Sequence, residues 1–129
     1  MAGYSATPLP RKLGIGPDSE VVVIGGDPGL DLPVRHTLGP FDVAVWYPAD
    51  RAELTSRLAE FRAVMRPAAG LWIAWPKKAS KVPTDLGEDT IREVALPTGL
   101  VDNKVCAIDA TYSGLRLVIR RELRPAGGR

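Results

Sequence analysis

The sequence predicts a single α/β domain with a mostly parallel sheet. Three short apolar runs (20–24, 41–47 and 71–75) are each closed by Gly or Pro, as is typical of strands buried on both faces. Between the second and third run, apolar residues recur at helical spacing over 51–65. Strand, helix and strand in this order form a βαβ unit, whose two strands lie parallel in one sheet. A chain of 129 residues has room for one hydrophobic core.

The N-terminal third holds an arm, a strand and a long connection. Residues 1–16 are expected to form an arm with one helical turn, opened by Thr7-Pro8 and ended by Gly14. Residues 20–24 form the first strand. The stretch 27–40 has little periodicity, so a turn and one short strand around 34–38 are expected there.

The clearest helix follows the second strand. Asp50 and Glu53 have the spacing of a capping box with Asp as the cap. Pro67 and Gly70 are expected to end the helix before the third strand. Its inward face is formed by Leu54, Leu58, Phe61, Val64 and Met65.

The C-terminal third predicts a helix and two strands. Asp85 and Glu88 repeat the cap spacing, so a helix is expected over about 87–96. Strands near 104–108 and 115–121 are joined by a hairpin-like connection. In the last strand Arg116 and Arg120 alternate with apolar residues, which predicts an edge strand with one solvated face. Residues 122–129 are expected to be a disordered basic tail.

Together these elements predict a reduced Rossmann-like three-layer sandwich over residues 1–129, with a C-terminal antiparallel hairpin. The net charge is only +2, and Cys106 and His36 are the single cysteine and the single histidine. These counts exclude a disulfide framework and argue against structural zinc. The sequence has neither a signal-peptide pattern nor the ~20 apolar residues of a membrane span, so a cytoplasmic location without membrane contact is expected.

The order of the elements resembles class I S-adenosylmethionine-dependent methyltransferases. Phe41-Asp42-Val43 leading into the helix, and then Arg66-Pro67-Ala68-Ala69-Gly70-Leu71-Trp72-Ile73, look like the fourth strand, the helix and the fifth strand of that fold. The closing helix and hairpin are similar too, so the resemblance covers roughly residues 41–121. It implies that the fold is methyltransferase-like.

The chain also resembles a bacterial family with a domain of unknown function numbered 3052 (DUF3052), over almost its whole length. That family has no assigned activity, so the resemblance implies membership alone. It rests on the phrases Ala2-Gly3-Tyr4-Ser5, Trp75-Pro76-Lys77-Lys78-Ala79-Ser80, Leu96-Pro97-Thr98-Gly99-Leu100-Val101-Asp102-Asn103-Lys104 and Ser113-Gly114-Leu115-Arg116.

The methyltransferase cofactor is not expected to carry over. In those enzymes an acidic residue ending the first strand and a Gly-x-Gly-x-Gly turn hold the cofactor, as in related dinucleotide folds. Here Gly25 and Gly29 fit that turn, but Val23 replaces the acid and Asp27 the middle glycine. Only ten residues separate Leu30 from the second strand, whereas one βαβ unit needs roughly 30. The adenosine-binding half is therefore expected to be missing, and no cofactor is predicted.

A candidate cleft lies where the carboxyl ends of the strands meet, because open α/β sheets bind ligands there. Its predicted wall combines a glycine loop, two tryptophans and two lysines: Gly25, Gly26, Asp27, Gly29, Trp46, Trp75, Lys77 and Lys78. The alternative is that Gly and Pro only end the strands while the tryptophans fill the core. Lys77, Lys78 and Lys81 could also contact nucleic-acid phosphates, although charged runs are usually solvated surface.

The sequence carries no enzyme signature. His36 has no triad-like partners, and Cys106 sits among apolar neighbours, where a thiol is usually inert. We therefore expect no catalytic residues and no metal, in a non-catalytic module, monomeric or homodimeric, that binds a small molecule or a protein partner. Two alternatives stay open. One is a reduced methyltransferase-like enzyme that completes its cofactor site across a dimer; the other, less favoured, is nucleic-acid binding through Lys77, Lys78 and Lys81.

Overall fold

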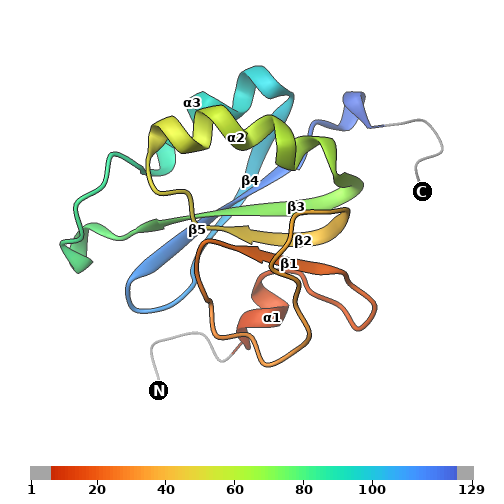
Figure 1. Cartoon of the computed structure of the whole chain (residues 1–129), viewed down its shortest axis with the longest axis horizontal. Helices are drawn as coiled ribbons and strands as arrows, with labels where there is room; N and C mark the ends of the chain where they lie inside the picture. Colours follow the sequence, from red (N-terminus) through yellow and green to blue (C-terminus); the bar gives the residue numbers. More distant parts are fainter. Residues whose placement is uncertain (1–6, 125–129) are drawn as a thin grey trace.

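The computed structural model describes residues 7–124, which form one five-stranded sheet with helices on both faces (Figure 1). The order of strands across the sheet is β1-β2-β3-β5-β4. Their bounds are Val21–Ile24 (β1), Phe41–Trp46 (β2), Met65–Pro76 (β3), Leu100–Ala107 (β4) and Tyr112–Ile119 (β5).

The sheet is mixed. β1 pairs with β2, and β2 with β3, in parallel, while β5 is antiparallel to both β3 and β4. Four strands run in one direction, as the predicted mostly parallel sheet requires. Half of the neighbouring pairs are nevertheless antiparallel, because the one reversed strand has two neighbours. The C-terminal hairpin is antiparallel, as predicted.

The prediction that the last strand lies at the edge of the sheet is wrong. β5 lies inside the sheet, and the strand before it, β4, forms the edge. The alternation that suggested a solvated face has another cause: Arg116 pairs with Trp72 and lies across Gly70 of β3, where a Cβ would be 2.4 Å from its Nε. A missing side chain on the neighbouring strand thus accommodates the arginine.

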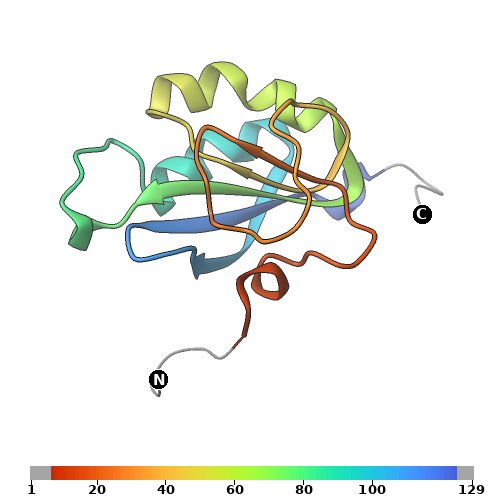
Figure 2. The same cartoon turned by 60° about the horizontal axis from the view of Figure 1, so that its bottom comes forward.

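Two helices cover one face of the sheet and a single helical turn lies on the other (Figures 1 and 2). The covering helices are α2 (Arg51–Ala63) and α3 (Glu88–Ala95), and the single turn is α1 (Leu9–Lys12), the turn expected in the N-terminal arm. The third layer of the predicted sandwich is therefore α1 together with the loops around it. A short strand was expected around 34–38 in the connection 27–40. The structure has a single parallel bridge there, between Arg35 and Val22.

The helix ends follow from side-chain and backbone contacts. Asp50 caps α2 as predicted, since its Oδ1 accepts a hydrogen bond from the Glu53 amide at 2.8 Å. Asp85 was expected to cap α3, but it accepts from the Arg51 amide at 2.9 Å, and Gly87 is the N-cap of α3. α2 also ends earlier than predicted, because β3 begins at Met65 and includes Pro67, beside a register shift against β2.

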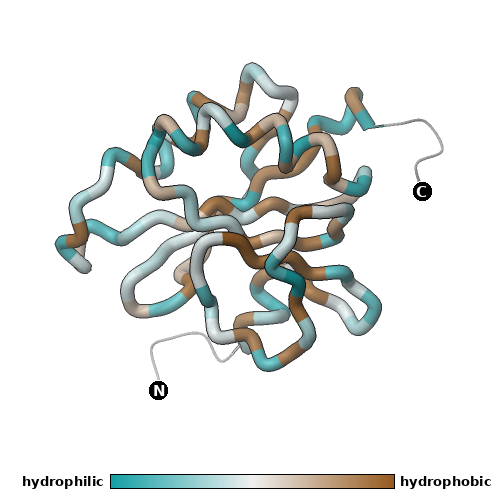
Figure 3. Tube along the Cα trace, viewed as in Figure 1, coloured by the Kyte–Doolittle hydropathy of each residue, from teal (hydrophilic) through white to brown (hydrophobic). Residues whose placement is uncertain are grey.

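Each face of the sheet has its own apolar cluster, and brown segments concentrate along the strands (Figure 3). Under α2 and α3, the Trp46 indole stacks on Phe61 with ring centroids 4.0 Å apart. On the α1 side, the Trp72 Nε1 donates to the Leu13 carbonyl at 3.0 Å, and both side chains are fully buried. This bond anchors the end of α1 to the centre of the sheet.

The C-terminal end of the described chain differs in part from the sequence prediction. Arg121–Leu123 form a short 3-10 helix, η3, which joins the last residue of the predicted strand to the first two residues of the segment 122–129 that was expected to be a disordered tail. Residues 1–6 and 125–129 lie outside the described residues. The Trp75–Pro76 peptide is trans. Among residues 7–124, the helices are too short or too polar to cross a membrane.

Candidate functional site

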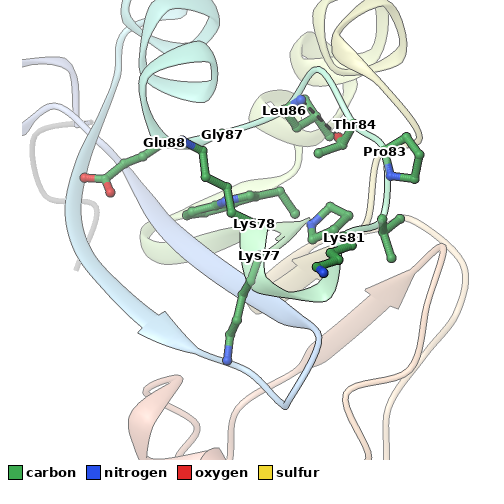
Figure 4. Close-up of a pocket in the computed structure, with 11 residues that line it drawn as sticks. Lys77, Lys78, Lys81, Pro83, Thr84, Leu86, Gly87 and Glu88 are labelled. Carbon is green, nitrogen blue, oxygen red and sulfur yellow. Dashed lines mark hydrogen bonds between the residues drawn. The ribbon is translucent and has the colours of Figure 1, made fainter.

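A hollow of about 530 Å³ opens at the carboxyl end of β3, between the loop that follows this strand and the start of α3 (Figure 4). Trp75 and Leu86 contribute apolar surface, and Glu88 stands at one end. The other residues that line it come from one continuous loop and the cap of α3: Pro76, Lys77, Lys78, Lys81, Val82, Pro83, Thr84 and Gly87.

The three lysines are not equivalent. Lys77 is the N-cap of the 3-10 helix η1 (Lys78–Ser80) and Lys78 is its first residue. Lys81 is the C-cap, in the left-handed conformation with φ of 61°. In Figure 4 the Lys78 side chain reaches toward Gly87, whereas Lys77 points away from this segment. Within the described chain none of the three ammonium groups forms an ion pair. The hollow therefore has a cationic side with one inward lysine.

The far wall is the start of α3. Gly87 is the N-cap of this helix and makes no side-chain hydrogen bond. Because Gly87 and Glu88 line the hollow, the first amides of α3 lie beside it. Glu88 is held by Arg92, whose Nη2 donates to its Oε2 at 2.8 Å. Thr84 is also occupied, since its Oγ1 accepts from the Leu86 amide at 3.0 Å. The wall thus offers amide and apolar surface, with its carboxylate already paired.

A smaller hollow of about 250 Å³ lies beside the first, at the carboxyl ends of β1 and β2. The two share Pro76 and the segment 82–84. The smaller hollow is lined by Gly25, Tyr47 and Tyr112, and the two tyrosine rings meet edge to face at 5.0 Å between centroids. Gly26, Asp27 and Gly29, which were predicted to form the cleft, line neither hollow.

Tyr47 packs against the glycine loop that was predicted to form one wall of the cleft. A Cβ on Gly26 would lie 2.5 Å from the Tyr47 ring, and one on Gly25 would lie 2.8 Å from the Tyr47 carbonyl oxygen. Asp27 closes the loop itself, because its Oδ1 accepts from the Gly29 amide at 2.8 Å. These contacts occupy the backbone that a cofactor would approach.

S-adenosylmethionine, which the methyltransferase resemblance implies, does not fit this turn. Val23 stands where those enzymes carry the acidic residue, and it is buried at 1% exposure. The Tyr47 ring covers the backbone of Gly26. At this turn of the described chain, position 23 therefore lacks the acid, and the backbone of Gly26 is not open to a cofactor.

The other candidate residues from the sequence analysis lie outside both hollows. Trp46, predicted as a cleft wall, is 1% exposed and packs on Phe61 because its side of β2 faces α2. The His36 Nδ1 lies 3.0 Å from the Val23 carbonyl oxygen. Cys106 lies half-buried in β4, and burial raises the pKa of its thiol. In residues 7–124, no three His, Cys, Asp or Glu side chains gather as a metal site would require.

The sequence indicated part of this site. Trp75, Lys77, Lys78 and Lys81 line the larger hollow, so the strand-end rule located one wall. The opposite wall, residues 82–88, was missed. Its only local signal was the helix start at Gly87, which does not reveal that α3 begins against the loop after β3.

The solved structures that align with this chain include several methyltransferases. The CcbJ methyltransferase from Streptomyces caelestis aligns with a TM-score of 0.57 at 9% identity, over 87% of this chain and 87% of that one. A proposed methyltransferase from Thermoplasma acidophilum aligns with a TM-score of 0.52 at 8% identity, over 80% and 69%. The magnesium protoporphyrin IX methyltransferase from Synechocystis, solved with bound SAM, gives 0.49 at 12% identity, over 65% and 41%.

These likenesses show the fold alone: the chain is an α/β domain with a mixed five-stranded sheet, and it resembles the Rossmann-like fold of methyltransferases. It spans about two fifths of the length of the Synechocystis enzyme. No protein-family model and no curated protein sequence matches the chain, so the resemblance to the DUF3052 family stays a prediction.

Proposed function

We propose that this chain is a non-catalytic binding module of methyltransferase-like fold, which takes a small anionic ligand with an apolar ring in the larger hollow. The observation that carries the proposal is the pairing of two walls across this hollow, Trp75 with Lys78 on one side and the start of α3 on the other. Ligands of open α/β sheets bind at this edge. The free amides of a helix start and a lysine both favour an anion.

The apolar half of the ligand has its own surface. Trp75 is partly exposed at the end of β3, and Pro76, Val82 and Pro83 continue the wall. Binding sites commonly combine such apolar walls with a few polar groups that fix orientation. Val82 is 44% exposed, so a ligand here would cover apolar surface that is now in contact with water.

The non-catalytic part of the proposal rests on the state of the polar groups around the hollow. Its single carboxylate, Glu88, is bound by Arg92, and the Thr84 hydroxyl is engaged by the Leu86 amide. General acid–base chemistry needs a group with a free proton site within reach of the substrate. Lys78 is the remaining titratable group that reaches toward α3.

Thermal unfolding with a panel of nucleoside monophosphates tests this function. A ligand at about 100 times its dissociation constant adds roughly 2.7 kcal/mol, which raises Tm by several degrees for a domain of this size. We expect such a rise, and we expect Trp75→Ala and Lys78→Ala each to remove it. Lys77→Ala is the matched control, because it deletes the same charge from a side chain that points away.

Two results would count against the proposal. A flat panel would eliminate the small anionic ligand and direct the search to protein partners. Equal loss in Lys77→Ala and Lys78→Ala would mean that net charge, and not the hollow, attracts the ligand. Steep salt dependence together with preference for an oligonucleotide would favour the nucleic-acid alternative instead.

A reduced methyltransferase-like enzyme is the second candidate, because the solved structures of similar fold are methyltransferases. It requires that a second copy supply the missing half of the cofactor site. S-adenosylmethionine and S-adenosylhomocysteine therefore belong in the same panel. Stabilisation by either compound, with Tm rising as protein concentration rises, would favour this enzyme over the binding module.

A further inference from the structure

A separate hollow of about 230 Å³ lies on the α1 side of the sheet and is lined by four cationic residues. Arg11 and Lys12 come from α1, Lys104 from β4 and Arg116 from β5. The remaining lining residues are Leu13, Gly14 and Asn103. No Asp or Glu lines this hollow.

None of the four cations forms an ion pair within the described part of the chain. Their side-chain hydrogen bonds go to neutral oxygens instead: Lys104 Nζ donates to the Lys12 carbonyl, and Arg116 Nη1 to Asn103 Oδ1, both at 3.3 Å. Arg92 on the other face is bound by three carboxylates. The hollow therefore concentrates four cations that have no carboxylate partner among the described residues.

A β-bulge keeps carboxylates out of this hollow. The register of β4 against β5 shifts between Asp102, which is opposite Leu117, and Lys104, which is opposite Arg116. In a regular strand, residues two apart share a face, so Asp102 would lie beside Lys104. The bulge turns Asp102 to the α3 side, where it accepts from Arg92, and leaves Lys104 on the α1 side.

Gly70 of the neighbouring strand β3 leaves room for the Arg116 side chain. Its guanidinium group lies over Gly70, where a Cβ would approach Nε to 2.4 Å. Burial, and then the neighbouring Arg124, hold the pKa of Arg116 below its ordinary value. Among the described residues Arg116 has one side-chain hydrogen bond and no carboxylate partner. A planar guanidinium is well suited to phosphate oxygens.

We propose that this hollow binds the phosphate group of a small phosphorylated ligand, with Arg116 and Lys104 as the central donors and α1 closing one side. The four cations come from three segments and converge on one hollow, which suits a single phosphate. A nucleic-acid backbone would need a basic stripe that follows successive phosphates. The site lies on the opposite face from α3 and does not depend on the proposed function.

Titration with pyrophosphate at constant ionic strength, followed by calorimetry or backbone NMR shifts, tests this site. We expect saturable binding to the wild-type chain and roughly tenfold weaker binding in Arg116→Gln and in Lys104→Gln. The double variant Arg51→Gln/Arg121→Gln is the control, because it removes two exposed charges that line neither hollow. It is expected to bind within twofold of wild type. Lys104 is exposed, so its variant keeps a folded readout available.

Gly70→Ala adds a test that removes no charge. The new Cβ must displace the Arg116 guanidinium, so we expect weaker pyrophosphate binding at unchanged net charge. Equal weakening in the Arg51→Gln/Arg121→Gln control, or no saturation at millimolar pyrophosphate, would overturn the proposal. Much tighter binding of an oligonucleotide or of anionic vesicles, dependent on Lys77 and Lys81 as well, would also overturn it.

Discussion

The ring of Tyr47 lies directly against the backbone of Gly26, with room for no side chain between them: a Cβ on Gly26 would be 2.5 Å from Cγ and Cδ1 of the ring. The glycine turn after β1 is thus shaped to receive a tyrosine from the end of β2. This contact separates the chain from a cofactor-binding turn of the same general sequence.

The first prediction follows from that contact. Gly26→Ala should destabilise the protein by about 1–3 kcal/mol, because the new Cβ displaces the half-buried ring of Tyr47. In a Tyr47→Ala background the same substitution should cost much less, so the double-mutant cycle should show strong coupling. Urea unfolding measures both. Gly16→Ala is the matched control, because the nearest atom to its new Cβ is Ser19 Oγ at an ordinary 3.7 Å. Additive costs at Gly26 and Tyr47 would contradict the packing account.

The second prediction concerns the Tyr47 hydroxyl, which is buried without a hydrogen-bond partner among the described residues. Removing an unsatisfied hydroxyl relieves a desolvation cost, so Tyr47→Phe should be neutral or stabilising by about 1 kcal/mol at neutral pH.

Alkaline pH gives a second readout. Burial, followed by Asp109 and Asp27, raises the pKa of Tyr47 above its ordinary value. Because the pKa of Tyr47 is higher in the folded state, the unfolded state releases the phenolic proton first. The full free energy of unfolding is therefore kept below the unfolded pKa of about 10, and it falls as pH rises beyond that value. Wild type should therefore lose more stability than Tyr47→Phe between neutral pH and pH values above ten. Parallel curves for the two proteins would show that the phenol is solvated.

The framework of the fold could be predicted because its signals are local. The βαβ unit rests on apolar runs ended by Gly or Pro, and the start of α2 rests on Asp50 with Glu53 three residues later. The position of β5 could not be predicted in the same way. The sequence pattern of an arginine alternating with apolar residues is the same in a solvated edge strand and in an inner strand that packs the arginine over a glycine. That glycine, Gly70, lies 46 residues earlier in the chain than Arg116, so no local signal links the two.

The candidate site was predictable to a similar extent. Trp75 lies at the carboxyl end of β3 and Lys78 just after it, at the edge where open sheets bind ligands. Tyr47 also follows a strand end, but only the tertiary structure reveals that its ring fills the glycine turn. The cationic hollow depends on a β-bulge at Asn103, and a one-residue bulge leaves no clear mark on the alternation of β4.

The third prediction concerns acid stability. Hydrogen bonds and charge from Arg92 hold the pKa of Asp102 below its ordinary value. A depressed folded-state pKa contributes stability above the unfolded value of about 3.9, and this contribution is lost as pH falls through the folded pKa. Asp102→Asn should thus lower stability at neutral pH and flatten its decline in acid. Unfolding free energies from pH 2 to 6 measure this, with exposed Asp18→Asn as control; equal slopes for Asp102→Asn and wild type would refute the coupling.

The fourth prediction concerns the attachment of α1. Leu13 is fully buried, and its carbonyl accepts the Trp72 indole hydrogen bond, so this residue joins the N-terminal turn to the sheet. Leu13→Ala should cost about 2–5 kcal/mol through the cavity it leaves. Leu96→Ala, at a side chain that is 47% exposed, should change stability by less than about 0.5 kcal/mol.

Hydrogen exchange distinguishes local release of α1 from general destabilisation. The Leu13 and Gly14 amides are bonded to the Leu9 and Arg11 carbonyls within the turn. If Leu13 anchors the turn, these two amides should lose protection in Leu13→Ala well before the amides of β3 do. Release of α1 would also move Arg11 and Lys12 away from Lys104 and Arg116, so the same variant should bind pyrophosphate more weakly while still folded. Unchanged protection and unchanged pyrophosphate affinity would mean that α1 is held by contacts other than Leu13.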